Sequence, residues 1–223
     1  RPGQYDEYGR EGCEKGESPD GSGRADKEGK RIYAQIRGRI EGLSAREAIL
    51  AINEWNAEQV CYRSTDDRTI SALDAWRSGF GRCGEESAFA VNALRAAGLP
   101  ARQVYTPRWA HCDDNHAWVE VFCDGAWHFL GACEPEETLD CGWFTGAASR
   151  ALLVHSRCFG TPAADEEIIS VDGAVTFLNQ TARYAPVRML TAQVREPEPE
   201  PGWPRVRMRQ ERERPQVRGP GLR

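Results

Sequence analysis

The sequence predicts an α+β fold, in which a helical first half is followed by antiparallel strands. Apolar residues recur at helical spacing up to residue 97, and from residue 101 they follow the two-residue period of strands. The dipeptide Asp124-Gly125 then separates two strand-like segments at the length of a two-residue hairpin turn. Helices and strands segregated along the chain in this way indicate an α+β fold rather than a parallel βαβ arrangement.

The composition fits one medium-sized domain with extended ends. The chain has 223 residues, 40% of them hydrophobic, and a formal net charge of -5 at pH 7. No segment approaches the roughly 18 consecutive apolar residues of a membrane span, and the mild acidic balance gives no sign of nucleic-acid binding. Because residue 1 is Arg rather than Met, we expect the start of the chain to be missing, which leaves export and the cellular compartment open.

Both ends of the chain have the composition of disordered segments. Residues 1–30 are rich in Gly and in charges of both signs, and they contain no Val, Ile, Leu or Phe that could form a core. Residues 195–223 are rich in Pro, Arg and Glu. We therefore predict disorder over 1–30 and 195–223 and a folded domain over 31–194.

Three helices are expected before the strands. Ser44 and Glu47 have the spacing of a capping box, which predicts a helix over 45–58. The apolar residues that this helix would turn inward are Ile49, Leu50 and Ile52.

The other two helices have glycine at their ends. The pattern over 69–80 predicts a short helix that closes near Gly79. A helical pattern also begins at Cys83, and it ends where Gly98 provides a C-terminal cap and Pro100 prevents continuation.

Strands are predicted over 101–105, 116–122 and 126–131. An apolar segment at 150–156 and a late strand candidate at 173–184 complete the domain.

The hairpin turn fixes an expected register. With Asp124-Gly125 as the loop, Cys123 pairs with Ala126, and the same register places His116 opposite Cys133. Glu134 lies one residue beyond, and a bulge or a longer loop would bring it directly opposite His116.

Cys83 differs from the other seven cysteines in its surroundings. It stands at a predicted helix start, where free amide groups and the helix dipole favour a thiolate, and Gly81 and Gly84 allow a close approach. The negative charges of Glu85 and Glu86 would raise the pKa of the thiol. We expect Arg82 and a protonated histidine partner to outweigh them.

His116 and Glu134 complete a possible catalytic set. His116 opens a strand and can act as a base, and Glu134 ends the next strand and can orient it. A nucleophile, a base and an orienting acid are what acyl transfer through a thioester requires.

These residues resemble the core of the transglutaminase-like superfamily, which includes transglutaminases, peptide N-glycanases and many microbial cysteine proteases. The resemblance is carried by "GRCGEESAFAVNALRAAGLPARQVY", "NHAWVEVF" and "WHFLGACEPE", and it spans about residues 60–160. The shared pattern is a helix-starting Cys after Gly, G-[LI]-P-A-R after the helix, H-A-W-x-E-V on a strand, and then Trp and an acid before Pro. The resemblance implies a papain-like α+β fold with Cys83 as the nucleophile and His116 as the general base.

The resemblance also indicates where the third catalytic residue should be. Members of the superfamily commonly have an Asp four residues after the strand Trp, which here would be Gly131. The nearest acid is Glu134, which precedes Pro135 as the acid of the superfamily usually does, and Asp140 is a poorer substitute.

Other residues are candidates for the oxyanion hole and the cleft. The oxyanion would be bound by the Cys83 amide and an upstream side chain, either Tyr62 or Trp76. The segment 105–116 either contributes to the cleft or only forms a tight loop. The cleft candidates in or after it are Arg108, Trp109, His111, Asp113, Asp114 and Trp118.

No metal or other cofactor is expected. No two cysteines have C-x-x-C spacing, and a zinc site among Cys112, Cys123, Cys133, Cys141 and His111 would need long, irregular intervals. Disulfides are the better alternative for these cysteines if the protein is exported. His128 and His155 are interpreted as structural.

The sequence thus predicts a cysteine-dependent enzyme that acts on a peptide or protein substrate with an amide acyl donor. Hydrolysis is favoured over transamidation, since no acidic cluster has calcium-loop spacing. A peptide N-glycanase-like amidase and a non-catalytic peptide- or cell-surface-binding module remain as alternatives. The oligomeric state stays open.

Overall fold

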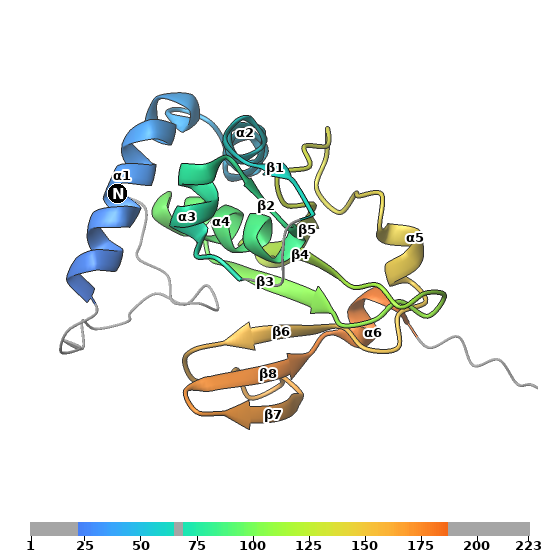
Figure 1. Ribbon diagram of the computed structural model, residues 1–223. Helices are drawn as coiled ribbons and strands as arrows, with labels where there is room; N and C mark the ends of the chain where they lie inside the picture. The colour runs from blue at the N-terminus through green and yellow to red at the C-terminus, as the bar shows by residue number, and fades with distance from the viewer. Residues whose placement is uncertain (1–21, 65–68, 187–223) are drawn as a thin grey trace, which may run out of the picture. The chain divides into compact units, whose positions relative to one another are not determined.

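The computed structural model describes residues 22–64 and 69–186, and it confirms the predicted α+β fold. Helices α1 to α4 lie together on one side of a sheet (Figure 1). The helices are α1 (Ser22–Ile40), α2 (Ala45–Gln59), α3 (Ala72–Ser78), α4 (Cys83–Ala96), α5 (Thr145–Ala148) and α6 (Thr181–Tyr184). The strands are β1 (Cys61–Tyr62), β2 (Phe80–Gly81), β3 (Ala101–Thr106), β4 (His116–Cys123), β5 (Ala126–Leu130), β6 (His155–Cys158), β7 (Ile168–Asp172) and β8 (Val175–Asn179).

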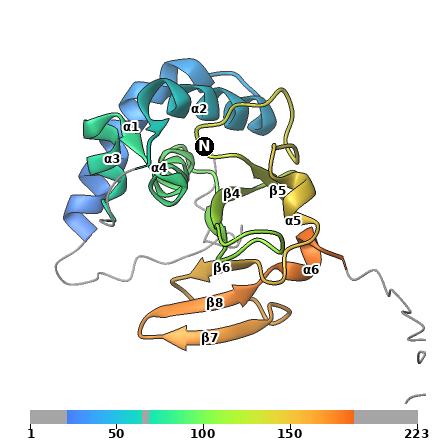
Figure 2. The ribbon, with the colours of Figure 1, turned by 45° about the vertical axis from the view of Figure 1, so that its right-hand side comes forward.

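The main sheet has six antiparallel strands in the order β5-β4-β3-β6-β8-β7. The short strands β1 and β2 pair in parallel beside it and place Tyr62 next to Gly81. Helix α4 lies between the sheet and the other three long helices, and it contacts β3 and β4 (Figure 2). The middle of the sheet therefore supports the start of α4.

The predicted hairpin is confirmed residue by residue. Cys123 pairs with Ala126, and the pairing continues in the expected register to Val119 and Leu130. Asp124 and Gly125 both have positive φ, 51° and 81°, as a type I′ turn requires. Strand β5 ends at Leu130, so the pairing stops before Cys133.

The prediction of disorder over 1–30 is wrong for residues 22–30, which form the first turns of α1. The helix is held further along by Ile32 and Ile36, which are buried in the core. Once such a segment is fixed, adding helical turns to it costs little, so residues that cannot form a core can still be helical. Residues 1–21 and 195–223 lie outside the described residues.

The late strand candidate at 173–184 is two elements. Strand β8 ends at Asn179, and the short helix α6 follows it. The partner strand β7, in which no residue is buried, lies outside the strands that the sequence predicted.

Each face of the sheet has its own core. On the helical side, Val119 and Val121 of β4 pack with Phe89 and Leu94 of α4. The second cluster joins the strands to α5 and α6 and contains Val104, Trp109, Trp118, Phe144, Ala148, Ala151, Val154 and Tyr184.

A buried ionic network ties α6 to the sheet. Glu120 of β4 accepts a hydrogen bond from Arg102 Nε at 2.6 Å and from the Tyr184 hydroxyl at 2.7 Å. Arg183 Nε lies 2.9 Å from the same carboxylate, and Arg102 also contacts Glu166 at 2.9 Å. Glu120 is fully buried, so within the described part of the chain these partners offset its charge.

We expect Glu120→Gln to lower the free energy of unfolding by about 3–5 kcal/mol, because it leaves Arg102 as a buried cation with a weakened partner. Urea denaturation of the full chain measures this. Glu58→Gln is the matched control, since it breaks the exposed pair of Glu58 with Arg39 and should change stability little. Equal losses in the two variants would contradict the assignment.

Candidate active site

One cleft of ≈ 850 Å³ contains the cysteine, the histidine and the acid that the sequence singled out. It opens where the start of α4 meets the ends of β3 and β4. The lining residues are Tyr62, Ser64, Thr69, Arg82, Cys83, Gly84, Glu85, Gln103, Tyr105, Asp114, Asn115, His116, Glu134, Trp143 and Arg157.

Cys83 is the first residue of α4, as predicted. Glu85 helps to fix this helix start, because its carboxylate accepts a hydrogen bond from the Arg82 backbone amide at 2.7 Å. The Arg82 guanidinium also binds Glu85, at 2.9 Å. Burial opposes the ionisation of Glu85, but these bonds from Arg82 hold its pKa below the ordinary value. Arg82 is therefore engaged by Glu85 rather than directed at the thiol.

Two glycines beside Cys83 have different roles. A side chain at Gly81 would bring its Cβ within 2.8 Å of the Glu85 Cβ, so glycine lets α4 pack against β2. At Gly84 a Cβ would meet nothing within 4 Å, and this residue lines the cleft. Gln103 of β3 then holds the helix start against the sheet by donating to Gly84 O at 2.9 Å and to Ser87 Oγ at 2.7 Å.

The thiol of Cys83 lies next to the start of β4. Burial raises its pKa, and hydrogen bonds from the backbone amides of Ala117 and Gly84 oppose that effect. The negative charges of Glu86 and Asp114 raise the pKa further. The Ala117 amide belongs to the residue after His116, so the thiol lies beside the beginning of the histidine strand.

His116 is buried among aromatic rings. Its ring centroid lies 4.8 Å from Trp143 and 5.0 Å from Phe144, and it is 5% exposed. Burial lowers the pKa of His116 to about 4, although the charge of Asp114 acts in the opposite direction. Among the described residues, no group forms a hydrogen bond with the buried Nε2 atom. The imidazole is thus neutral at neutral pH, unlike the protonated partner that the sequence led us to expect.

The side chain of Glu134 lies over Gly131. A Cβ at position 131 would stand only 2.6 Å from Glu134 Oε2, so the absence of a side chain there makes room for this carboxylate. Asn53 of α2 holds the turn: it donates to Gly131 O at 2.9 Å and accepts from Cys133 N at 3.1 Å. No sequence pattern singles out Asn53, which is one polar residue on an amphipathic helix.

Trp143 connects the acid to the histidine. Its indole Nε1 donates to Glu134 Oε2 at 3.0 Å, and its ring packs on His116. Burial raises the pKa of Glu134, and the bond from Trp143 partly offsets this. Trp143 is 64% exposed although it is a large aromatic residue, and the sequence pattern did not single it out.

Several predicted cleft residues lie elsewhere. Trp76 packs on Trp55 and Phe89, donates to Gln59 at 3.1 Å and is not among the residues that line the cleft. Trp118 is fully buried in the second core. Side chains two positions apart on a strand point to the same face of the sheet, so Trp118 lies on the same aromatic face as His116.

The loop before β4 contributes only part of its length to the cleft. Asp114 lines it, whereas Trp109 is buried against the His116 ring. Arg108 forms an ion pair with Asp113, and His111 stacks on the outer face of Trp109. The residues of this loop that do not line the cleft are Arg108, Trp109, His111 and Asp113.

The alternative acid, Asp140, is engaged outside the cleft. Its carboxylate lies 2.6 Å from His128 Nδ1 and accepts from Phe129 N at 3.0 Å. Tyr62, the other oxyanion candidate, lines the cleft and is exposed.

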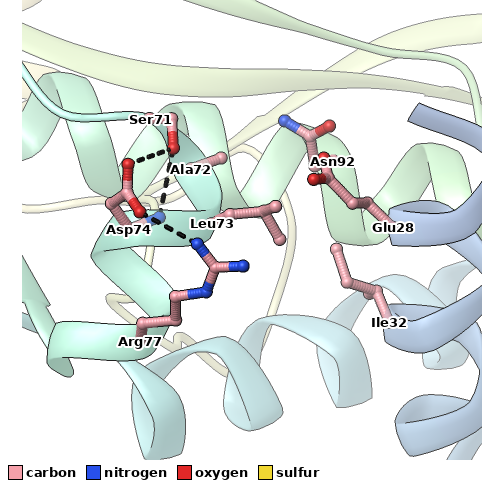
Figure 3. Close-up of a pocket in the computed structure, with 8 residues that line it drawn as sticks. All are labelled: Glu28, Ile32, Ser71, Ala72, Leu73, Asp74, Arg77 and Asn92. Atoms are coloured by element: carbon pink, nitrogen blue, oxygen red, sulfur yellow. Dashed lines mark hydrogen bonds and ion pairs between the residues drawn. The ribbon is translucent and has the colours of Figure 1, made fainter. Parts of the chain in front are cut away.

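A second cavity of ≈ 410 Å³ lies between α1, α3 and α4 (Figure 3). Its polar groups are already paired, since Asp74 binds Ser71 at 2.8 Å and Arg77 at 3.2 Å. It contains no cysteine or histidine, so it offers no nucleophile and base.

Disulfides and a zinc site were the alternatives for the cysteines, and residues 22–64 and 69–186 bear on both. The seven cysteines in these ranges carry free thiols, and no group of three potential metal ligands forms there. None of the helices in the same ranges is long and apolar enough to cross a membrane.

The helix-starting Cys83 and the strand-starting His116 line one cleft of an α+β domain with an antiparallel sheet. Residues 31–132 match the family model of the transglutaminase-like superfamily core. The chain therefore carries a core domain of the transglutaminase-like superfamily, as its motifs predicted.

Three solved structures share weak similarity with the chain. A "putative cysteine protease" of Cytophaga hutchinsonii is 23% identical with a TM-score of 0.41; the match covers 70% of this chain and 58% of that one. LapG of Legionella pneumophila is 13% identical with a TM-score of 0.40, over 52% and 73% of the two chains. A TGase is 17% identical with a TM-score of 0.40, over 66% and 37%. No curated protein sequence matches the chain.

Glu86 provides a pH-dependent test of the site's electrostatics. Burial, followed by the charges of Glu134 and Glu85, raises its pKa to about 8. Between about pH 4.5 and pH 8 the folded state therefore holds a proton that the unfolded state releases, and stability falls as the pH rises. Glu86→Gln removes this dependence. We expect the free energy of unfolding of Glu86→Gln, minus that of the wild type, to increase by at least about 1 kcal/mol as the pH is raised from 4.5 to 8.

Urea denaturation at the two ends of the range measures the difference. The exposed residue Glu136 provides the control, because Glu136→Gln should follow the wild-type curve. Parallel curves for Glu86→Gln and the wild type would show that Glu86 is ionised in the folded protein.

Proposed function

We propose that the protein is a cysteine-dependent acyl-transfer enzyme that acts on peptide or side-chain amide bonds and that favours hydrolysis. The observation that supports this proposal is that Cys83 and His116 line the same cleft, within a core domain of the transglutaminase-like superfamily. The helix start at Cys83 adds a free backbone amide where an oxyanion would form.

The reaction begins from a neutral pair. His116 takes the proton of the Cys83 thiol as the sulfur attacks the carbonyl carbon of the amide, and the negative charge moves to the carbonyl oxygen. The low pKa of His116 keeps it able to accept that proton, while burial disfavours a resting thiolate. The Cys83 amide and the Tyr62 hydroxyl are the donors that we assign to the oxyanion.

The intermediate then collapses to a thioester. The carbon–nitrogen bond breaks, and His116 gives its proton to the departing amine. In the second half, His116 takes a proton from water as the water oxygen attacks the thioester. The acid product leaves, and the thiol of Cys83 is restored by the proton on His116.

Glu134 serves as the third member, through Trp143. Its carboxylate binds the indole N–H, and the indole packs on His116, so the acid fixes the histidine ring by way of the tryptophan. Glu134 and Trp143 are therefore positioning residues in this proposal.

The proposal is tested on a tryptic digest of an unfolded protein, to which a primary amine is added. Mass spectrometry of the products distinguishes cleavage of peptide bonds, conversion of side-chain amides to acids, and incorporation of the amine. We expect hydrolysis products. Cys83→Ala should abolish them, and His116→Ala should reduce the rate by about 1,000-fold or more.

Cys141→Ser is the matched control, because Cys141 is exposed and lies outside the cleft. It should retain wild-type turnover. Turnover that survives Cys83→Ala would overturn the proposal, and a wild-type protein that binds peptides without converting them would support the binding-module alternative.

A double-mutant cycle tests the role of Glu134. If Glu134 acts through Trp143, then Glu134→Gln, Trp143→Phe and the double variant should lower kcat to a similar extent, by about 10- to 100-fold, because each breaks the same link. The effect should fall on kcat rather than on KM. Additive losses, or a Trp143→Phe variant as active as the wild type, would contradict the link through Trp143.

A further inference from the structure

The cleft carries a cation that the proposed acyl transfer does not use. Arg157 lies on β6 and lines the cleft together with Cys83. Strand β6 pairs with β3 so that Tyr105 faces His155. Because strand residues alternate between faces, Arg157 shares the sheet face of Gln103 and Tyr105, which is the face that supports the start of α4.

Tyr105 lines the cleft with both this cation and Cys83. The pKa of Tyr105 is raised by burial and then by Cys83, and the positive charge of Arg157 lowers it. Both groups thus act on the same phenol. The guanidinium itself lies over the ring of Phe177 on β8, with its Cζ atom 5.8 Å from the ring centroid.

Among the described residues that line the cleft, no carboxylate pairs with Arg157. Arg82, which also lines the cleft, is bound by the carboxylate of Glu85. In the described part of the chain, Arg157 forms no ion pair, and its side chain is exposed. Its fork of N–H donors is therefore free to bind an anion from solution, and a carboxylate fits that fork in a bidentate manner.

Asp114 adds a negative charge to the cleft, in addition to the positive charge of Arg157. It also lines the cleft, and its negative charge acts on Cys83, His116 and Tyr105. A substrate with an acidic group would be repelled from the side of Asp114 and attracted to the side of Arg157. The two charges together would orient the amide over Cys83.

We propose that Arg157 binds a carboxylate of the acyl-donor substrate, so that the enzyme prefers amides with an acidic group close to the bond that is attacked. This inference names the substrate class of the proposed function and rests on it. Arg157 is a specificity-determining residue and takes no part in the proton transfers.

The test compares two alkylating reagents of equal shape, bromoacetyl-glutamate amide and bromoacetyl-glutamine amide. The rate of Cys83 alkylation by each is measured by peptide mapping of the full chain at one mildly alkaline pH. We expect Arg157→Gln to lower the ratio of the glutamate rate to the glutamine rate by about tenfold, since a hydrogen-bonded charge pair is lost. Arg157→Lys should lower it less, because it keeps the charge without the fork.

Arg37→Gln is the matched control. Arg37 is exposed on α1 and lies outside the cleft, so this variant should keep the wild-type ratio. Added salt should lower the wild-type ratio toward that of Arg157→Gln. In the digest assay, wild-type products should be enriched in Asp or Glu beside the reacting amide, and Arg157→Gln should lose this enrichment.

The two ways of failing are distinguishable. An unchanged ratio in Arg157→Gln, with Cys83 still alkylated, would overturn the role of Arg157 and leave the nucleophile in place. If neither reagent alkylates Cys83 while the exposed Cys141 reacts, the proposed function fails, and the inference fails with it.

Discussion

The close packing of the first turn of α4 against β2 and β3 is the contact on which the cleft depends. Gly81 has no room for a side chain, since a Cβ there would overlap with Glu85. Gln103 then binds the backbone of the same turn from the sheet. These contacts set Cys83 beside the Ala117 amide and hence beside His116. Cys83, the nucleophile that we propose, is thus held by regular secondary structure on both sides, and such elements position a side chain more precisely than loops do.

Strand β4 serves two cores at once, and this explains the setting of the histidine. Val119 and Val121 face the helices, whereas His116 and Trp118 face the aromatic cluster on the other side. Glu120 fastens the buried end of that second core through Arg102 and α6. The aromatic rings on this face of the sheet therefore pack against the imidazole of His116 and shield it from water.

Short sequence patterns were enough to predict the elements that depend on residues close together in the chain, such as the hairpin and the helix starts. The hairpin register follows from Asp124-Gly125, because only that pair supplies two adjacent positive φ angles at the correct place. Trp143, Asn53 and Arg157 could not be found in this way, since each reaches the site from a segment distant in sequence and its role exists only in the packed fold. Trp118 was predicted to line the cleft because it is close to His116 in sequence, but it is buried in the second core. Closeness in sequence does not determine whether a side chain lines a cleft or packs in a core. For α1, composition indicated the absence of a core but not the absence of a helix.

The balance of charges around Cys83 is decided by burial. The sequence suggested that two glutamates would oppose a thiolate and that Arg82 with a protonated histidine would have to outweigh them. In the fold, Glu85 is neutralised by Arg82, and Glu86 has a pKa of about 8, so most of it is protonated at neutral pH. Desolvation is the largest cause acting on Cys83 and on His116, and it favours the uncharged form of both. The resting site is therefore a neutral thiol beside a neutral imidazole. In the reaction that we propose, charge separates only when a substrate carbonyl is present to receive it, and the neutral His116 is the base that accepts the proton of the thiol.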